Sequence, residues 1–201
     1  MDERRSVYNY CVRGEIDEAL SLARDIKDSW NRCQSLSMVA DYIKSNVQAR
    51  MHIIDAAFSA AGKQSEPNRI VTVSAWPLEV LCRHGDLSRA KAEVERLIGI
   101  IQPEPHPVRR ADALFMLVKK THAYSSNLTK ALLIPFKKAC SEGRGWKIDR
   151  DLRDVSEWVA EFDHDEALNL VEIIFKPHVK RQAFRLIEQL NSIKDSQKNS
   201  Q

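Results

Sequence analysis

The sequence predicts an all-α fold: an α–α superhelix in which about five helical hairpins and a terminal capping helix form a right-handed solenoid. Three observations support this prediction. Apolar residues recur at helical spacing, alanines recur at intervals of 34 to 41 residues, and glycine and proline are few and clustered. Six glycines and seven prolines in 201 residues cannot supply the closely spaced turns of an all-β sandwich.

The first hairpin has the most regular pattern. Its second helix carries apolar residues at the spacing i, i+3, i+4, i+7 and i+10, which places them on one helical face. These residues are Ile16, Ala19, Leu20, Ala23 and Ile26. Gly14 precedes them and suits the left-handed conformation that ends a helix. The pattern therefore predicts a helix–glycine–helix hairpin at the start of the chain.

Further segments continue the helical pattern along the chain. They span residues 36–43, 54–56, 73–81, 87–101, 114–118, 127–131, 155–159, 163–168 and 184–190. Gly85 is expected to end a helix as Gly14 does, and Asp86 and Asn127 are expected to cap the helices that follow them. Pro67 and Pro107 suit the first turn of a helix.

Other prolines mark a loop and two conflicts. The segment from Pro103 to Pro107 reads PEPHP and is the clearest loop in the sequence. Pro77 and Pro135 lie inside apolar runs. Each of them either kinks its helix or marks a helix boundary.

The recurrent alanines define the repeat. One lies near the start of the second helix of each hairpin, where a small side chain lets the preceding helix cross closely. These are Ala19, Ala56, Ala90, Ala131 and Ala167. A single hairpin cannot bury its apolar stripe, whereas stacked hairpins can, so the unit is repeated.

Composition and chain ends predict one soluble domain. We expect a single α-helical repeat domain over residues 1–191 and a disordered polar tail over 192–201. The net charge is +3, and the excess lies after residue 100. The N-terminus is too polar for a signal peptide, and no segment approaches the length of a membrane span. Four dispersed cysteines indicate reduced thiols and a cytoplasmic location.

The pattern Gly-Asp/Glu-x-x-x-Ala at the start of a second helix resembles tetratricopeptide-like repeats. The residues 18–43 also look like the divergent α-helical hairpin repeat common in bacterial proteins. The best matches begin at Gly14 and Gly85, and the resemblance covers roughly residues 5 to 190. It implies a helical-hairpin solenoid, an architecture that serves many functions.

No catalytic motif is present in the sequence. A phosphate-binding P-loop, a dinucleotide glycine fingerprint, a zinc-protease HExxH and a GxSxG elbow are all absent. Gly143-Arg144-Gly145 is expected to be a loop, and Asp163-His164-Asp165 is expected to cap a helix. The sequence therefore predicts no catalytic residue, no cofactor and no metal site.

Basic residues recur near the start of each first helix, among them Arg32, Arg69 and Arg110. They could form a ladder that binds carboxylates or phosphates of a partner. Alternatively, each could contact an acidic residue or a carbonyl of the neighbouring hairpin, with Asp28 and Asp55 as plausible partners.

Two tryptophans, Trp30 and Trp146, are expected in breaks between helices, where an exposed aromatic side chain could anchor a partner. With the three arginines, Trp146 completes the set of candidate partner-binding residues.

These patterns predict a non-enzymatic protein–protein interaction module or scaffold that binds a peptide or helix in a solenoid groove. An alternative is RNA binding through the basic later repeats, in which Arg144, Lys147 and Arg150 lie close to Trp146. Acidic residues interleave with these cations, which favours a mixed solvated surface. A weaker alternative is an enzyme whose cleft is not visible as a motif.

Overall fold

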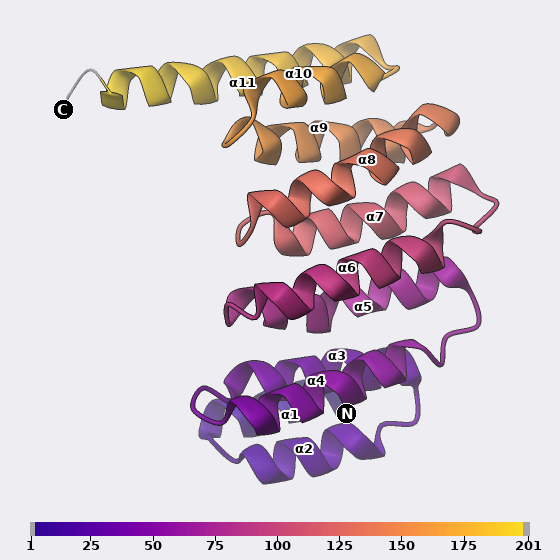
Figure 1. Ribbon diagram of the computed structural model, residues 1–201, viewed down its shortest axis with the longest axis vertical. Coiled ribbons are helices and arrows are strands. Elements are labelled where there is room, and N and C mark those ends of the chain that lie inside the picture. Colours follow the sequence, from indigo (N-terminus) through magenta and orange to yellow (C-terminus); the bar gives the residue numbers. More distant parts are fainter. Residues whose placement is uncertain (1–2, 199–201) are drawn as a thin grey trace. The chain divides into compact units, whose positions relative to one another are not determined.

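The computed structural model describes residues 3–198, with side chains through residue 193, and within this range every regular element is an α-helix (Figure 1). The helices are α1 (Glu3–Arg13), α2 (Ile16–Asp25), α3 (Ser29–Tyr42), α4 (Val47–Ala61), α5 (Pro67–Arg83), α6 (Leu87–Ile101), α7 (Pro107–Thr121), α8 (Ser126–Glu142), α9 (Trp146–Ala160), α10 (His164–Ile173) and α11 (Pro177–Lys198). The prediction of an all-α fold is confirmed. No helix in this part of the chain is both long and apolar enough to cross a membrane.

The chain divides into two compact units, Met1–Pro103 and Glu104–Gln201. The single domain expected over residues 1–191 stays a prediction. The division falls at the proline-rich loop that begins at Pro103, where fixed backbone angles and missing N–H groups prevent helix continuation. Helix α11 continues to Lys198, so it includes most of the segment expected to be disordered, and residues 199–201 lie outside the described residues.

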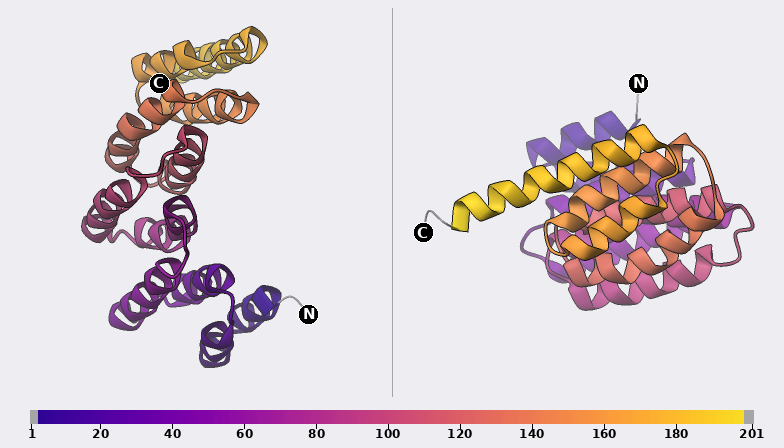
Figure 2. Two further views of the ribbon diagram at one scale, coloured as in Figure 1. Left: turned by 90° about the vertical axis from the view of Figure 1, so that its right-hand side faces the viewer. Right: turned by 90° about the horizontal axis from the view of Figure 1, so that it is seen from above.

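Each unit consists of antiparallel helical hairpins packed in sequence. In unit 1, α1 pairs with α2, α3 with α4 and α5 with α6, and the first helices α1, α3 and α5 contact one another in succession. In unit 2, α7 pairs with α8 and α9 with α10, while α11 packs on both α9 and α10. Figure 2 shows these pairs from two further directions.

Two glycines end first helices as expected. Gly14 and Gly85 both have a φ of +78°, a conformation that costs glycine little because it lacks a Cβ atom. After α1, the amide of Gly14 donates to Cys11 O and the amide of Glu15 donates to Tyr10 O. The same two bonds recur after α5, and together they form the Schellman motif that satisfies the last carbonyls of a helix.

The two interior prolines do not interrupt their helices. Pro67 and Pro107 occupy the first helical position, as expected. Pro77 lies inside α5, where it cannot donate to the carbonyl of Val73 four residues earlier. The thiol of Cys33 in α3 donates to that carbonyl at 3.5 Å, so a neighbouring helix replaces part of the missing bond. Pro135 lies within α8.

The small residue near the start of each second helix is confirmed in three hairpins. Ala19, Ala90 and Ala167 are each the fourth residue of their helix and are fully buried. The assignment was wrong for Ala56 and Ala131. Ala56 lies in the middle of α4 and is partly exposed, and Ala131 is exposed on α8.

The corresponding fourth positions are Arg50 in α4 and Thr129 in α8, both buried. The helices begin earlier than expected because Asn46 and Ser125 cap them, accepting from the amides of Ala49 and Leu128. Asn127 is therefore a helical residue rather than the expected cap. Asp86 occupies the expected cap position of α6, although its side chain makes no capping bond there.

Candidate functional site

The recurrent basic residues serve first as structural links. Arg32, the fourth residue of α3, donates from Nε to Ile26 O at 2.6 Å and from Nη2 to Lys27 O at 3.3 Å. Arg110, the fourth residue of α7, donates to Glu104 O and forms an ion pair with Glu142. Lys180, the fourth residue of α11, reaches Glu172 O at 3.3 Å. Arg32 and Arg110 thus bind carbonyls of the connections that precede α3 and α7, and the interpretation that each arginine links its hairpin to the neighbouring one stays a prediction.

Arg69 differs from the other two arginines. Its side chain is exposed, and its guanidinium lies 5.8 Å from the centre of the Trp30 ring, which in turn meets Trp76 edge to face at 6.3 Å. Neither expected acidic partner is used. Asp28 caps α3 through the amide of Asn31, and Asp55 pairs with Arg89 at 2.9 Å. Trp30 lies within the first turn of α3 and is only partly exposed.

Two cation–aromatic pairs of unit 2 form what we call the aromatic–arginine patch: Trp146 with Arg150, and Phe175 with Arg144. Trp146 is 61% exposed and Phe175 is 72% exposed. The Arg150 guanidinium lies 5.1 Å from the centre of the Trp146 ring, and the Arg144 guanidinium lies 5.9 Å from that of Phe175. Each exposed ring is therefore paired with a cation in cation–π geometry.

The patch is built on two connections, between α8 and α9 and between α10 and α11, which lie at the same end of unit 2, on the right in Figure 1. Gly143-Arg144-Gly145 forms the first connection, which confirms the expected loop. A Cβ atom at Gly143 would lie 2.5 Å from Ile148 Cδ1, and Gly145 has a φ of +147° that favours glycine. Glycine is therefore favoured at both positions, at Gly145 by its φ and at Gly143 because a Cβ atom would displace the Ile148 side chain.

Asp149 holds the second connection in place. It is the fourth residue of α9, the position where α3 and α7 carry arginines, and it is almost fully buried. Its carboxylate accepts from the backbone amides of Phe175 at 2.9 Å and Lys176 at 3.3 Å. A carboxylate that accepts backbone N–H bonds fixes a loop firmly, because bonds to a charged acceptor are stronger than neutral ones. The aspartate that replaces the recurrent arginine at this position thus fixes the backbone of Phe175, whose ring is exposed to solvent.

The carboxylates around the patch are buried or paired. Arg150 pairs with Asp151 at 2.9 Å, and Lys147 pairs with Asp112 at 2.5 Å. Asp151 is fully buried, and this burial raises its pKa, while the hydrogen bond from Arg150 partly counteracts the rise. In contrast, the side chains of Arg144 and Lys176 have no ion pair among the described residues. The charge left unneutralised at the patch is positive.

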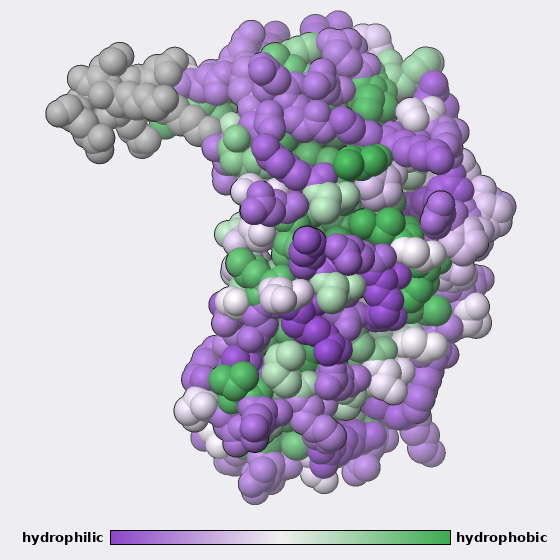
Figure 3. Space-filling view, in the orientation of Figure 1, coloured by the Kyte–Doolittle hydropathy of each residue, from purple (hydrophilic) through white to green (hydrophobic). Residues whose placement is uncertain are grey.

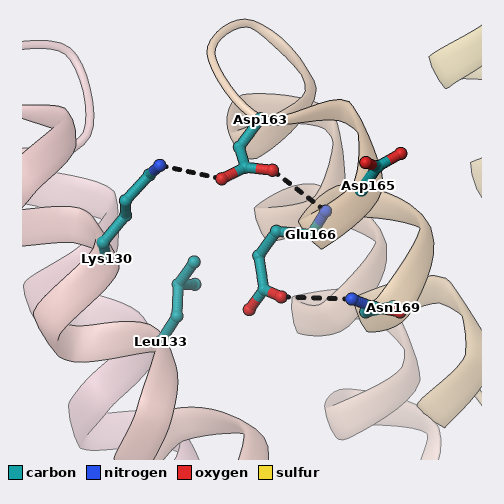
Figure 4. Close-up of a pocket in the computed structure, with 6 residues that line it drawn as sticks. All are labelled: Lys130, Leu133, Asp163, Asp165, Glu166 and Asn169. Carbon is teal, nitrogen blue, oxygen red and sulfur yellow. Dashed lines mark hydrogen bonds and ion pairs between the residues drawn. The ribbon is translucent and has the colours of Figure 1, made fainter.

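A separate feature, a pocket, lies between α8 and α10. This shallow pocket of about 320 Å³ is lined by Lys130, Leu133, Asp163, Asp165, Glu166 and Asn169 (Figure 4). Its charged groups are largely paired with one another. Lys130 lies 2.8 Å from Asp163, and Lys137 lies 2.6 Å from Glu166.

Asp163 also caps α10 by accepting from the amide of Glu166, which confirms the predicted cap. Its hydrogen bond with Lys130 is the main reason that its pKa is lowered. The charged groups of this pocket thus tie the two helices to each other.

Histidine and acidic side chains do not gather into a metal site in residues 3–193. His122 stacks on Trp158, with ring centres 4.4 Å apart and planes 6° from parallel. Burial lowers the pKa of His122. Both rings are partly exposed, and each is less exposed than Trp146 and Phe175.

No protein-family model matches the chain, and neither curated proteins nor solved structures give a significant match. The candidate site is therefore argued from its own geometry. Of the four predicted residues, Arg32 and Arg110 are largely engaged by carbonyls of the connections that precede α3 and α7, and Arg69 and Trp146 are exposed. Sequence reasoning missed Phe175. Its signal was an aromatic residue directly before the Lys-Pro start of a helix, in a break equivalent to that of Trp146.

Proposed function

We propose that this protein is a non-enzymatic protein-interaction module, or scaffold, that binds a partner through the aromatic–arginine patch of unit 2. The observation that supports it most directly is the exposure of Trp146 and Phe175, at 61% and 72%, on a rigidly held surface. Two large aromatic side chains exposed to this extent offer apolar area that a partner would remove from water on binding.

The chemistry of the patch resembles that of a binding hot spot. Tryptophan and arginine are the residues whose truncation most often weakens protein–protein complexes. Their side chains combine a large apolar area with planar hydrogen-bond donors, and the two cation–π contacts reduce the motion that binding would have to arrest. The buried Asp149 and the glycine loop supply the rigid support.

Within each unit, the hairpins would follow a tetratricopeptide-like α–α superhelix of right-handed sense. The support for this part of the proposal is the succession of contacts between neighbouring first helices: α1 with α3 and α3 with α5, then α7 with α9 and α9 with α11. A cytoplasmic location is supported by the four cysteines, which are free and buried.

RNA binding is the alternative function that experiments must distinguish from protein binding. The patch offers rings that could stack on bases, but several neighbouring cations are already paired, including Arg153 with Asp154 at 2.5 Å. Figure 3 shows one face of the molecule, on which hydrophilic residues predominate and hydrophobic residues lie in small groups. A localised aromatic anchor fits protein recognition better than it fits a track for an extended phosphate backbone.

A peptide-display selection against the full-length protein tests this function. We expect enriched peptides that bind the wild type and lose most of that binding to the Trp146→Ala variant. Tyr8→Ala is the matched control, because Tyr8 is a 49% exposed aromatic residue on α1, outside the patch. Peptides that bind the wild type and Trp146→Ala equally well would contradict the proposed site.

A further inference from the structure

We infer that the aromatic–arginine patch recognises an acidic peptide segment, in which carboxylates flank an aliphatic or aromatic side chain. This inference rests on the proposed function and specifies its partner. The apolar side chain would contact the exposed rings of Trp146 and Phe175, and the flanking carboxylates would meet the cations that no side-chain carboxylate neutralises.

Arg144 is the principal carboxylate-binding group. Its Nη1 donates to Ser141 O at 3.0 Å and to Gly143 O at 2.8 Å, which fixes the guanidinium above the Phe175 ring. Its Nε and Nη2 donors make no hydrogen bond to described residues, so they are available. An arginine fixed in this way loses little conformational entropy when it binds a carboxylate.

Lys176 adds a second positive charge next to Phe175. Its backbone amide is bound by Asp149, and its ammonium group has no ion pair within residues 3–193. The carboxylates near these cations are paired elsewhere or buried: Glu142 pairs with Arg110, and Glu172 pairs with Lys180. Asp149 is buried beneath the connection, and Asp151 is buried and paired with Arg150. The net charge presented to a partner is therefore positive and confined to one end of unit 2.

The same ion pairs argue against a nucleic acid as the occupant. A single strand needs several consecutive phosphate contacts, and each of these releases counterions. Lys147, Arg150 and Arg153 could extend such a track, but each would first have to give up its pair with Asp112, Asp151 or Asp154. Arg144 and Lys176 are the available cations, and they lie beside the rings of Trp146 and Phe175. This arrangement suits a peptide that carries one or two carboxylates beside one apolar side chain.

The test is fluorescence anisotropy with defined probes and the full-length protein at low salt. The first probe is a fluorescein-labelled 12-residue peptide with glutamates flanking Leu-Phe. The second replaces the glutamates by lysine, the third replaces Leu-Phe by Ser-Ser, and the fourth is a 12-nucleotide oligouridylate. We expect the first probe to bind at least about tenfold more tightly than each of the other three.

Variants then assign the binding to the patch. Arg144→Gln retains donors but removes the charge and is expected to weaken the first probe about tenfold. Trp146→Ala is expected to do the same, whereas Arg89→Ala and Tyr8→Ala, which alter exposed residues outside the patch, leave it unchanged. Far-UV circular dichroism and urea denaturation verify that each variant is folded.

Each result decides the inference. No saturable binding of the first probe overturns it, as does equal or tighter binding of the lysine probe or the oligouridylate. If display selection yields peptides that depend on Trp146 but carry no acidic residues, the proposed function stands and this inference is overturned. If neither display nor probe binding depends on Trp146, both are overturned.

Discussion

The buried Arg50 provides the most demanding test of how the hairpins are joined. It occupies the position that alanine or threonine fills in the other second helices, and its side chain is only 5% exposed. Its Nη1 donates to Ile43 O at 3.1 Å and more weakly to Lys44 O at 3.4 Å. Its Nη2 lies 3.5 Å from Asp86, at the start of α6 in the next hairpin. We predict that Arg50→Ala destabilises unit 1 by about 3 kcal/mol.

This magnitude follows from the contacts. The charged hydrogen bond to Ile43 O contributes about 1.5 kcal/mol. The two methylenes beyond Cβ contribute about 0.8 kcal/mol each through burial. The pair with Asp86 adds less than about 1 kcal/mol, because that carboxylate is 24% exposed and water can replace the guanidinium. The substitution also removes the desolvation penalty of the buried Arg50 guanidinium. This gain offsets part of the total and leaves a loss of about 3 kcal/mol.

Arg50→Met separates the two contributions. It keeps the apolar stem but removes the donors, so we expect about half the loss. Urea denaturation followed by tryptophan fluorescence measures both variants. With a slope of about 2 kcal/mol/M, the unfolding midpoint falls by roughly 1.5 M for alanine and half of that for methionine.

Arg89→Ala is the control for this prediction. Arg89 also pairs with a carboxylate, Asp55, but its side chain is 44% exposed, so the expected loss is below about 1 kcal/mol. If Arg50→Ala destabilised the protein no more than Arg89→Ala, Arg50 would not be a structural link, and the reasoning would be refuted.

Three further predictions concern glycine, pH and thiols. Gly14→Ala should lower the free energy of unfolding by about 1–2 kcal/mol, because the φ of Gly14 is +78°. Gly99→Ala within α6 should raise it by about 0.5–1 kcal/mol, because alanine favours the helix and has room there. Shifts of the same sign in thermal unfolding would contradict this pair of predictions. Burial lowers the pKa of His122 from 6.5, so the unfolded chain binds more protons just below pH 6.5 and stability falls as the pH decreases through that range. His122→Phe, which can still stack on Trp158, should reduce this fall in urea midpoints measured between pH 7.5 and 5.5. Burial raises the pKa of all four thiols, that of Cys33 to about 12, so Ellman's reagent at pH 8 should label them slowly until urea unfolds the chain.

The helices and their ends were largely predictable because the signals are local. Apolar spacing along residues 16–26 defines one buried face, and Gly14 and Gly85 end helices through hydrogen bonds spanning five residues. The register of α4 and α8 was not predicted, since the caps Asn46 and Ser125 were overlooked in favour of later alanines. A cap decides where a helix begins. Ser125 and Asn127 are both good capping residues, so the sequence did not show which of them caps α8.

The candidate site could be predicted only in part. Trp146 was identified because an aromatic residue beside basic residues lies close to a glycine-rich break. Its companion Phe175 lies 29 residues further along the chain. Only the folded hairpin brings the α10–α11 connection onto the first turn of α9, where Asp149 binds its amides.

The sequence by itself determined that the chain is helical, where most hairpins turn, and which basic residues recur. These properties depend on backbone angles and on side chains within a few positions of one another. Only the tertiary structure decided what the recurrent residues contact: Arg32 and Arg110 reach back to carbonyls, Arg50 replaces an expected alanine, and Cys33 binds the carbonyl freed by Pro77. Such contacts form only after each hairpin closes and packs on the next, so residues distant in the chain determine them jointly.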